Sequence, residues 1–162
     1  MEYNLPSELV KELNFGENAK NRIIAGVNKL ASAVKSTLGA SGKCVIYEDG
    51  RGKPVITKDG VTVAQSVTLL DPVENIGATL IKEAASKTVK EAGDGTTTAT
   101  VLAESLLKEI YKVLQTHNTR EVKQGIDNAV AKVIEYLESI KIDVDDDMLD
   151  HVAAISCNND KE

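Results

Sequence analysis

The sequence predicts a mainly α-helical fold that carries one small β-hairpin. Four long segments repeat apolar residues at steps of three and four, which is the period of an amphipathic helix. Residues 44–57 hold two short apolar runs around a glycine-containing turn, a pattern typical of a hairpin. Helix boundaries are also marked, for example by Asp71 and Pro72 at one start and by Gly93 at the end of the same segment.

The elements are expected in chain order, each bounded by a turn or cap signal. A first helix opens at Phe15, runs to Leu38 and ends at Gly39. The segment 61–64 has strand propensity, but Asp59 before it is a good helix cap, so a short helix is expected there. The remaining elements are two hairpin strands and three long helices, at 44–47, 55–57, 72–92, 96–115 and 119–140.

An acidic stretch near the end of the chain is expected to separate two domains. Aspartates crowd residues 143–150, and such a run of charge is typical of a solvated connection. Helical character returns at 152–155, but the segment that remains is too short to fold alone. The chain is therefore expected to hold one domain at 1–140 and the incomplete start of another at 141–162.

Composition and charge exclude several classes of function. The chain has 162 residues, of which 42% are hydrophobic and 3% aromatic, so a core of aliphatic side chains is expected. A net charge of −6 at pH 7 argues against a nucleic-acid partner. Cys44 and Cys157 stand far apart without ligand spacing, which argues against a disulfide framework or a zinc site. The sequence shows no membrane-spanning apolar run and no secretory or transit signal, so we expect a cytoplasmic location without membrane contact.

The most informative stretch is Gly-Asp-Gly-Thr-Thr-Thr-Ala-Thr at 93–100. It predicts a flexible turn that brings backbone N–H groups and hydroxyls to the start of a helix, and such a site attracts phosphate. Asp94 would repel a phosphate unless a divalent cation lies between them. The residues therefore indicate a nucleotide·Mg²⁺ site. The alternative is an ordinary helix cap, but three consecutive threonines exceed what one cap needs.

Two other loops are ambiguous when each is taken alone. Residues 37–42 are similar to a loop at a helix end whose backbone amides bind an anion. For this segment alone, however, termination of the helix by Gly39 is the simpler explanation of the glycines. A P-loop is excluded, because Thr37 stands where its first glycine is needed and Cys44 stands where Ser or Thr is needed. Asp59 suits a helix cap as well as it suits a catalytic role.

Taken together, the three loops resemble those of the group I chaperonins. The sequence reads T-L-G-x-x-G, then I-T-K-D-G, then G-D-G-T-T-T-A-T, at 37–42, 56–60 and 93–100. Further similar segments extend the resemblance over nearly the whole chain from Phe15, namely 21–37, 71–90, 124–127 and 155–156. The resemblance implies the N-terminal half of an ATP-binding equatorial domain, followed by the start of an intermediate domain.

The resemblance also implies which residues bind the nucleotide and its ions. Asp94 would hold Mg²⁺, in agreement with the argument from charge, and Asp59 would contribute to hydrolysis near the attacking water. K⁺ would be held by backbone oxygens of Thr37 and Lys58 and by the hydroxyl of Thr97. The residues expected around the ATP phosphates are Thr37, Leu38, Gly39, Ala40, Lys58, Asp94, Gly95, Thr96, Thr97 and Thr98.

The first loop departs from the pattern of that family. It usually reads T-L-G-P-K-G, whereas Ala40 and Ser41 stand here in place of Pro and Lys. Loss of Pro frees a backbone N–H and softens the loop, and loss of Lys removes a positive charge near the phosphates. The change bears on ATP affinity rather than on the mode of binding.

The chain lacks large parts of a group I chaperonin. No segment corresponds to the apical domain, which grips unfolded clients and the co-chaperonin, and the aspartate that serves as the main catalytic base is also absent. We therefore expect an N-terminal fragment of a ring-forming ATPase that assists protein folding, with identical subunits as partners and little or no ATPase activity of its own. Apolar surface should be exposed, and the hairpin should pair with a neighbouring subunit.

Two alternatives belong to other classes of protein. A complete 162-residue protein would act as a non-catalytic module that binds or caps a chaperonin ring through the same surfaces. A helical scaffold, in which the threonines are only caps, is the other alternative.

Overall fold

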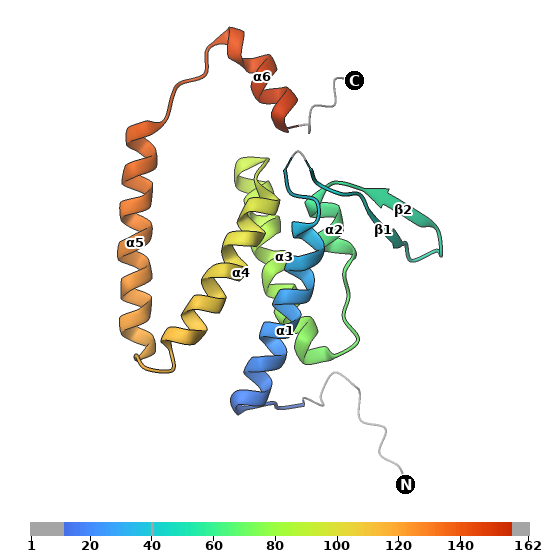
Figure 1. The fold of residues 1–162 in the computed structure, drawn as a ribbon, viewed down its shortest axis with the longest axis vertical. Coiled ribbons are helices and arrows are strands. Elements are labelled where there is room, and N and C mark those ends of the chain that lie inside the picture. Colours follow the sequence, from blue (N-terminus) through green and yellow to red (C-terminus); the bar gives the residue numbers. More distant parts are fainter. Residues whose placement is uncertain (1–11, 40, 157–162) are drawn as a thin grey trace. The chain divides into compact units, whose positions relative to one another are not determined.

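A computed structural model describes residues 12–39 and 41–156 of the chain (Figure 1). Within these residues, six α-helices and one antiparallel hairpin follow one another, which confirms the expected mainly α-helical class. The chain divides after Lys108 into two compact units. This division falls inside a helix, and the expected boundary between domains near residue 140 stays a prediction.

All of the expected helices and both strands are present. The short helix over the strand-like segment 61–64 is among them, and it begins directly after Asp59. The elements are α1 (Gly16–Lys35), β1 (Val45–Glu48), β2 (Pro54–Thr57), α2 (Gly60–Ser66), α3 (Pro72–Ala92), α4 (Thr96–Val113), α5 (Thr119–Ile140) and α6 (Asp146–Ser156).

The first helix ends three residues before the expected Leu38. The amides of Thr37 and Leu38 each donate to a carbonyl three residues earlier, at 3.1 Å, so the chain tightens into a turn after Lys35. In α3, by contrast, both predicted boundary signals act as expected. Asp71 accepts hydrogen bonds from two amides of the first turn, and Gly93 ends the helix with a φ of 76°.

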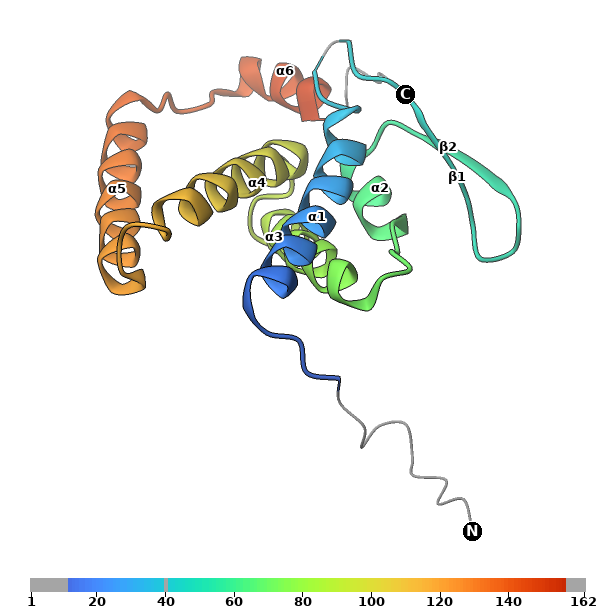
Figure 2. The same ribbon diagram turned by 60° about the horizontal axis from the view of Figure 1, so that its bottom comes forward.

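The core of the first unit lies between α1, α2 and α3, which run side by side (Figures 1 and 2). Two glycines allow α1 and α3 to approach closely. A Cβ on Gly26 would overlap the carbonyl of Glu74, and a Cβ on Gly77 would overlap the carbonyl of Ile23. The buried side chains that fill the core are aliphatic, as the composition predicts: Val27, Leu30, Val34, Val63, Ala64, Ala78 and Ile81.

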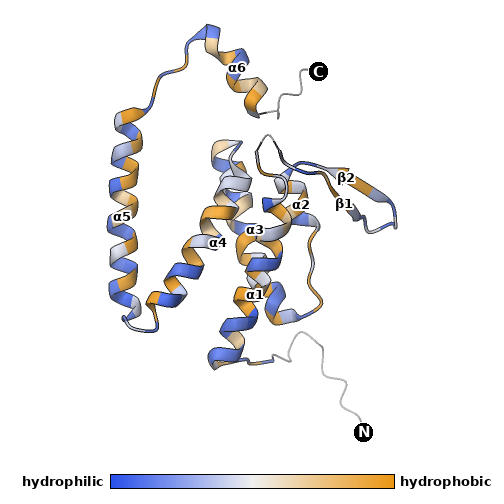
Figure 3. Cartoon of the chain, viewed as in Figure 1, coloured by the Kyte–Doolittle hydropathy of each residue, from blue (hydrophilic) through white to orange (hydrophobic). Residues whose placement is uncertain are grey.

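Apolar surface is exposed in both units, as the sequence predicts. On α4 the buried residues are polar, namely Thr96, Thr100 and Glu104, whereas Leu102 is 63% exposed and Leu106 is also exposed. In the second unit, α5 buries none of its residues. Figure 3 shows hydrophobic residues along both helices. The apolar period of α4 and α5 therefore does not identify the face that each helix buries.

The acidic stretch 143–150 is helical in part, which corrects its expected role as a solvated connection. The helix α6 begins at Asp146, and Asp145 accepts a hydrogen bond from the amide of Met148 at 3.0 Å. Asp146 and Asp147 occupy the first turn, where the helix dipole stabilises carboxylates. Only residues 141–145 connect α5 and α6 without regular structure.

The hairpin projects from the helices of its unit (Figures 1 and 2). Its strands are antiparallel, and Ile46 lies opposite Ile56. The turn is closed by Asp49, whose carboxylate accepts hydrogen bonds from the amides of Arg51 and Lys53 at 2.8 and 2.9 Å. The side chains of Ile46 and Ile56 are 68% and 66% exposed, so the hairpin presents an apolar surface.

Candidate functional site

The loop between α3 and α4 has the shape that an anion site needs. Gly93 and Gly95 both have a positive φ, of 76° and 84°, which only glycine adopts without strain. The carbonyl of Gly95 accepts the first hydrogen bond of α4, from the amide of Ala99 at 2.9 Å. The amides of Thr96, Thr97 and Thr98 therefore belong to the first turn, where N–H groups have no partner within the helix.

The three threonines differ in exposure. Thr96 is buried, Thr97 is half-buried with its hydroxyl against Gly60, and Thr98 is exposed. Asp94 is exposed beside them, and its Oδ1 accepts a hydrogen bond from the amide of Gly95 at 2.6 Å. The loop thus combines amides, hydroxyls and one accessible carboxylate within five residues.

The loop after α1 is a tight turn anchored to the last turn of that helix. Val34 O accepts hydrogen bonds from both the amide and the hydroxyl of Thr37, at 3.1 and 2.7 Å. The turn closes where the amide of Lys43 donates to Ser36 O at 2.7 Å. A Cβ on Gly42 would overlap the carbonyl of Thr37, so this carbonyl faces into the turn.

Among the other predicted residues of this first loop, Leu38 and Gly39 are exposed. Gly39 has a φ of 74°, which explains the glycine. Ala40, also expected to line the phosphates, lies outside the described residues.

Asp59 caps α2, which is one of the two roles that the sequence left open. Its Oδ2 accepts hydrogen bonds from the amide and the hydroxyl of Thr62, at 2.9 and 2.6 Å. Burial disfavours the charged form, but the hydrogen bonds from Thr62 and from the amide of Val61 outweigh it and hold the pKa of Asp59 below its ordinary value. The carboxylate is therefore ionised at neutral pH, and it remains exposed, as does Lys58 beside it.

Gly60 joins the three loops in space. A Cβ on this residue would overlap the hydroxyl of Thr97 and would lie 3.4 Å from Cγ1 of Val34. The start of α2 is therefore in contact with the start of α4 and with the last turn of α1. Gly60 stands in the second loop motif but was not among the predicted site residues. The signal that points to it is a glycine directly after a capping aspartate, where a helix needs none.

The donor set around these loops fits Mg²⁺ bound together with a phosphate. Within residues 12–39 and 41–156 no group of three or more His, Cys, Asp or Glu side chains could hold a metal ion. Mg²⁺ in nucleotide sites usually takes one or two carboxylates and completes its shell with phosphate oxygens and water. The exposed carboxylate of Asp94 is consistent with that chemistry.

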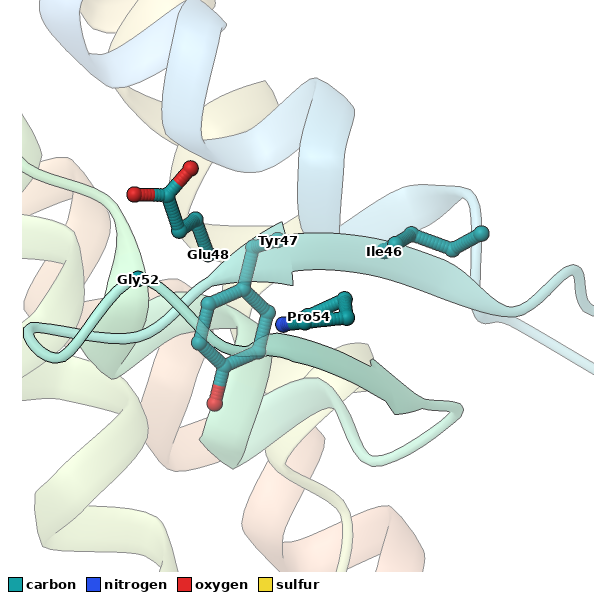
Figure 4. Close-up of a pocket in the computed structure, with 5 residues that line it drawn as sticks. All are labelled: Ile46, Tyr47, Glu48, Gly52 and Pro54. Atoms are coloured by element: carbon teal, nitrogen blue, oxygen red, sulfur yellow. The ribbon is translucent and has the colours of Figure 1, made fainter.

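A separate open hollow lies on the hairpin (Figure 4). It contains none of the predicted site residues, and its polar side chains do not converge on a point. The residues that line it are Ile46, Tyr47, Glu48, Gly52 and Pro54. We therefore place the candidate site at the three loops and not in this hollow.

Comparison with known proteins identifies the family. A model described as the TCP-1/cpn60 chaperonin family matches residues 30–162. The chain belongs to the TCP-1/cpn60 chaperonin family. The match confirms the chaperonin resemblance of the three loops, which all lie within the matched residues, while assignment to group I stays a prediction.

A solved chaperonin structure has a similar fold. It is the crystal structure of the chaperonin gp146 from the bacteriophage EL 2 (Pseudomonas aeruginosa) in the presence of ATP-BeFx, with a TM-score of 0.78 and 36% sequence identity. The match covers 90% of the present chain and 26% of the phage chaperonin chain. The present chain thus spans about a quarter of the length of that chaperonin. Among the described residues, none of the helices combines the length and the mean hydropathy of a membrane-spanning segment.

Proposed function

We propose that this chain is the ATP-binding segment of a cytoplasmic chaperonin that assists protein folding as a ring of identical subunits. The observation that carries the proposal is the contact of Gly60 with Thr97 and Val34. Because of it, the turn after α1, the capping aspartate of α2 and the glycine–threonine loop lie at one end of the unit. Family membership and the ATP analogue present with the phage chaperonin support the same function.

The expected roles of the residues follow from their groups. Amides and hydroxyls of residues 96–98 hold the ATP phosphates together with residues 37–40, and Lys58 borders the same site. Asp94 supplies a carboxylate to Mg²⁺, which neutralises charge on the phosphates when it is bound. Carbonyls of Thr37 and Lys58 and the hydroxyl of Thr97 are oxygen donors suited to K⁺.

Hydrolysis depends mostly on positioning and electrostatics in phosphoryl transfer. Asp59 is ionised and exposed at the start of α2, so it is able to orient a water molecule for attack on the γ-phosphorus. The main catalytic aspartate of group I chaperonins has no counterpart in these residues. We therefore expect little or no ATP turnover by the 162-residue chain, and turnover by a complete chaperonin that contains it.

Calorimetric titration with ATP, with and without Mg²⁺, tests the nucleotide site on this chain. Loss of one charged ligand is expected to weaken Mg²⁺-dependent binding by roughly 10- to 100-fold in Asp94→Asn. Asp143→Asn is the matched control, because it removes an exposed carboxylate from the connection after α5. Equal affinity of the two variants for Mg·ATP would exclude Asp94 as the metal ligand. Absence of ATP binding by the unmodified chain would favour the helical scaffold.

The intact mass of the polypeptide from its natural source separates the fragment from the complete module. A mass several times 17.4 kDa is expected, and it would support the chaperonin ATPase. A mass of 17.4 kDa would instead favour a non-catalytic module that binds or caps a chaperonin ring.

Ring assembly is proposed to use the hairpin. Ile46 and Ile56 face each other across the strands and are largely exposed, as expected for a surface that a neighbouring subunit covers. We expect Ile56→Lys to lower the sedimentation coefficient of the assembled protein. The control is Leu70→Lys, which changes an exposed leucine in the connection between α2 and α3. Identical assembly of both variants would contradict the role of the hairpin.

A further inference from the structure

The face that α4 buries in its unit is polar rather than apolar. Thr96, Thr100 and Glu104 recur every fourth residue and therefore share one face of the helix. Thr100 satisfies its hydroxyl within the helix, by donating to Thr96 O at 2.9 Å. Glu104 is different, because its buried carboxylate finds a partner on another helix.

The Glu104 side chain is 2% exposed, and two lysines compensate its charge. Oε1 lies 2.7 Å from Nζ of Lys108, one turn along α4, and Oε2 forms an ion pair with Nζ of Lys35 on α1. Burial raises the pKa of Glu104, but the hydrogen bonds from Lys108 and Lys35 outweigh it and hold the pKa below its ordinary value. The carboxylate is therefore ionised, and removal of a lysine partner would leave its buried charge less well compensated.

Lys35 stands where the first loop begins. It is the last residue of α1, and the turn that contains Thr37 leaves the helix directly after it. Glu104 stands two turns into α4, the helix whose first turn carries Thr97. The ion pair thus connects the two helices that carry the two proposed phosphate loops.

Few other contacts hold α4 to the rest of its unit. Within the described residues, the helices with extensive mutual packing are α1, α2 and α3. The start of α4 touches Gly60, and Ala103 packs at the edge of the core. The contact at Thr97 holds the start of α4, and the ion pair of Glu104 attaches the same helix to α1 seven residues farther along.

We propose that Glu104 is a positioning residue that, through Lys35, holds the threonine loop of α4 at a fixed distance from the turn after α1. The expected effect on ATP affinity rests on the proposed function, since both loops must reach the same phosphates. The expected effect on the separation of α1 and α4 does not depend on nucleotide and is measured separately.

The separation of α1 and α4 is the direct test. Nitroxide labels at Ser32→Cys and Ser105→Cys, both exposed, report this separation by pulsed electron resonance in the full chain with Cys44 and Cys157 changed to Ser. We expect Glu104→Gln and Lys35→Met to broaden the distribution of distances. Lys35→Arg, which keeps a positive charge, and Lys108→Met, which leaves the pair between helices intact, should give the distribution of the parent chain.

Affinity for Mg·ATP is the second readout. Glu104→Gln and Lys35→Met are expected to weaken it by about tenfold, while Lys35→Arg and Lys108→Met change it less than about twofold. Lys35→Met also covers the case in which Glu104→Gln fails to fold, because Glu104 keeps Lys108 as a partner. An unchanged distance distribution in Lys35→Met would overturn the proposal. A parent chain that binds no ATP would instead refute the proposed function and leave the distance measurement to decide the role of Glu104.

Discussion

Arg22 on α1 pairs with the same carboxylate of Asp71 that caps α3. Nη2 of Arg22 lies 2.7 Å from both carboxylate oxygens, and Nε lies 3.0 Å from Oδ2. On the other side, Oδ1 of Asp71 accepts hydrogen bonds from the amides of Val73 and Glu74, at 2.8 and 3.0 Å. One carboxylate therefore starts a helix and also joins it to its neighbour.

We expect the stabilising effect of Asp71 to depend on pH. Hydrogen bonds from the amide of Glu74 and from Arg22 hold the pKa of Asp71 below its ordinary value in the folded chain. Because the folded pKa is the lower one, the contribution is fully present above the unfolded pKa and is lost as the pH falls through the folded pKa. Asp71→Asn keeps a capping side chain but does not titrate.

Urea unfolding of the parent and of Asp71→Asn, from about pH 7 down to about pH 3, measures this dependence. The parent should have the higher midpoint at neutral pH, and the difference should shrink in acid. The control is Glu17→Gln, which removes an exposed ion pair with Lys20 and should change little. A difference that stays constant with pH would contradict the role of the ionised carboxylate.

Substitution of Gly26 should separate α1 from α3. A methyl group there overlaps the Glu74 carbonyl, which is backbone and cannot rotate away, so Gly26→Ala should lower the free energy of unfolding by about 1–3 kcal/mol. Gly125→Ala on α5 is the control. A methyl group there meets nothing within 4 Å, so the higher helix propensity of Ala should raise stability by roughly 0.5–1 kcal/mol. Equal changes in the two urea midpoints would contradict close packing at Gly26.

Gly60→Ala should weaken ATP binding, because it disturbs the start of α4. The added methyl displaces the hydroxyl of Thr97, which belongs to the proposed phosphate loop, and we expect a loss of about tenfold in affinity. Gly50→Ala in the hairpin turn adds a methyl group in open space and should leave affinity unchanged. Binding of a fluorescent ATP analogue measures both. Unaltered affinity in Gly60→Ala would show that the threonine loop does not touch the nucleotide.

The two roles of Asp59 are separable by two substitutions. Asn is also a good helix cap but lacks the ionised carboxylate, so Asp59→Asn should lower stability less than Asp59→Ala, which should lower it by about 1 kcal/mol. If the charge also serves hydrolysis, Asp59→Asn in the complete chaperonin should lose ATP turnover while its melting temperature stays above that of Asp59→Ala. Full turnover in Asp59→Asn would leave Asp59 with the capping role alone.

The elements and the family follow from signals that lie close together in the sequence. Local signals are sufficient for both, because caps such as Asp71 and terminators such as Gly93 act within one or two turns of their own helix. The three loop motifs are contiguous in sequence, so their resemblance to chaperonins was visible without knowledge of their arrangement.

The buried faces of the helices and the residues that join the loops are set by the packing of the helices. The apolar period of α4 predicts a core-facing stripe, yet Thr100 and Glu104 are buried and Leu102 is exposed. A period shows that a helix has two faces but not which partner is present to cover each one. The contact of Gly60 with Thr97 and the ion pair of Lys35 with Glu104 connect residues far apart in sequence. Such contacts depend on how the helices pack, and no local signal in a single sequence identifies the partner of each residue.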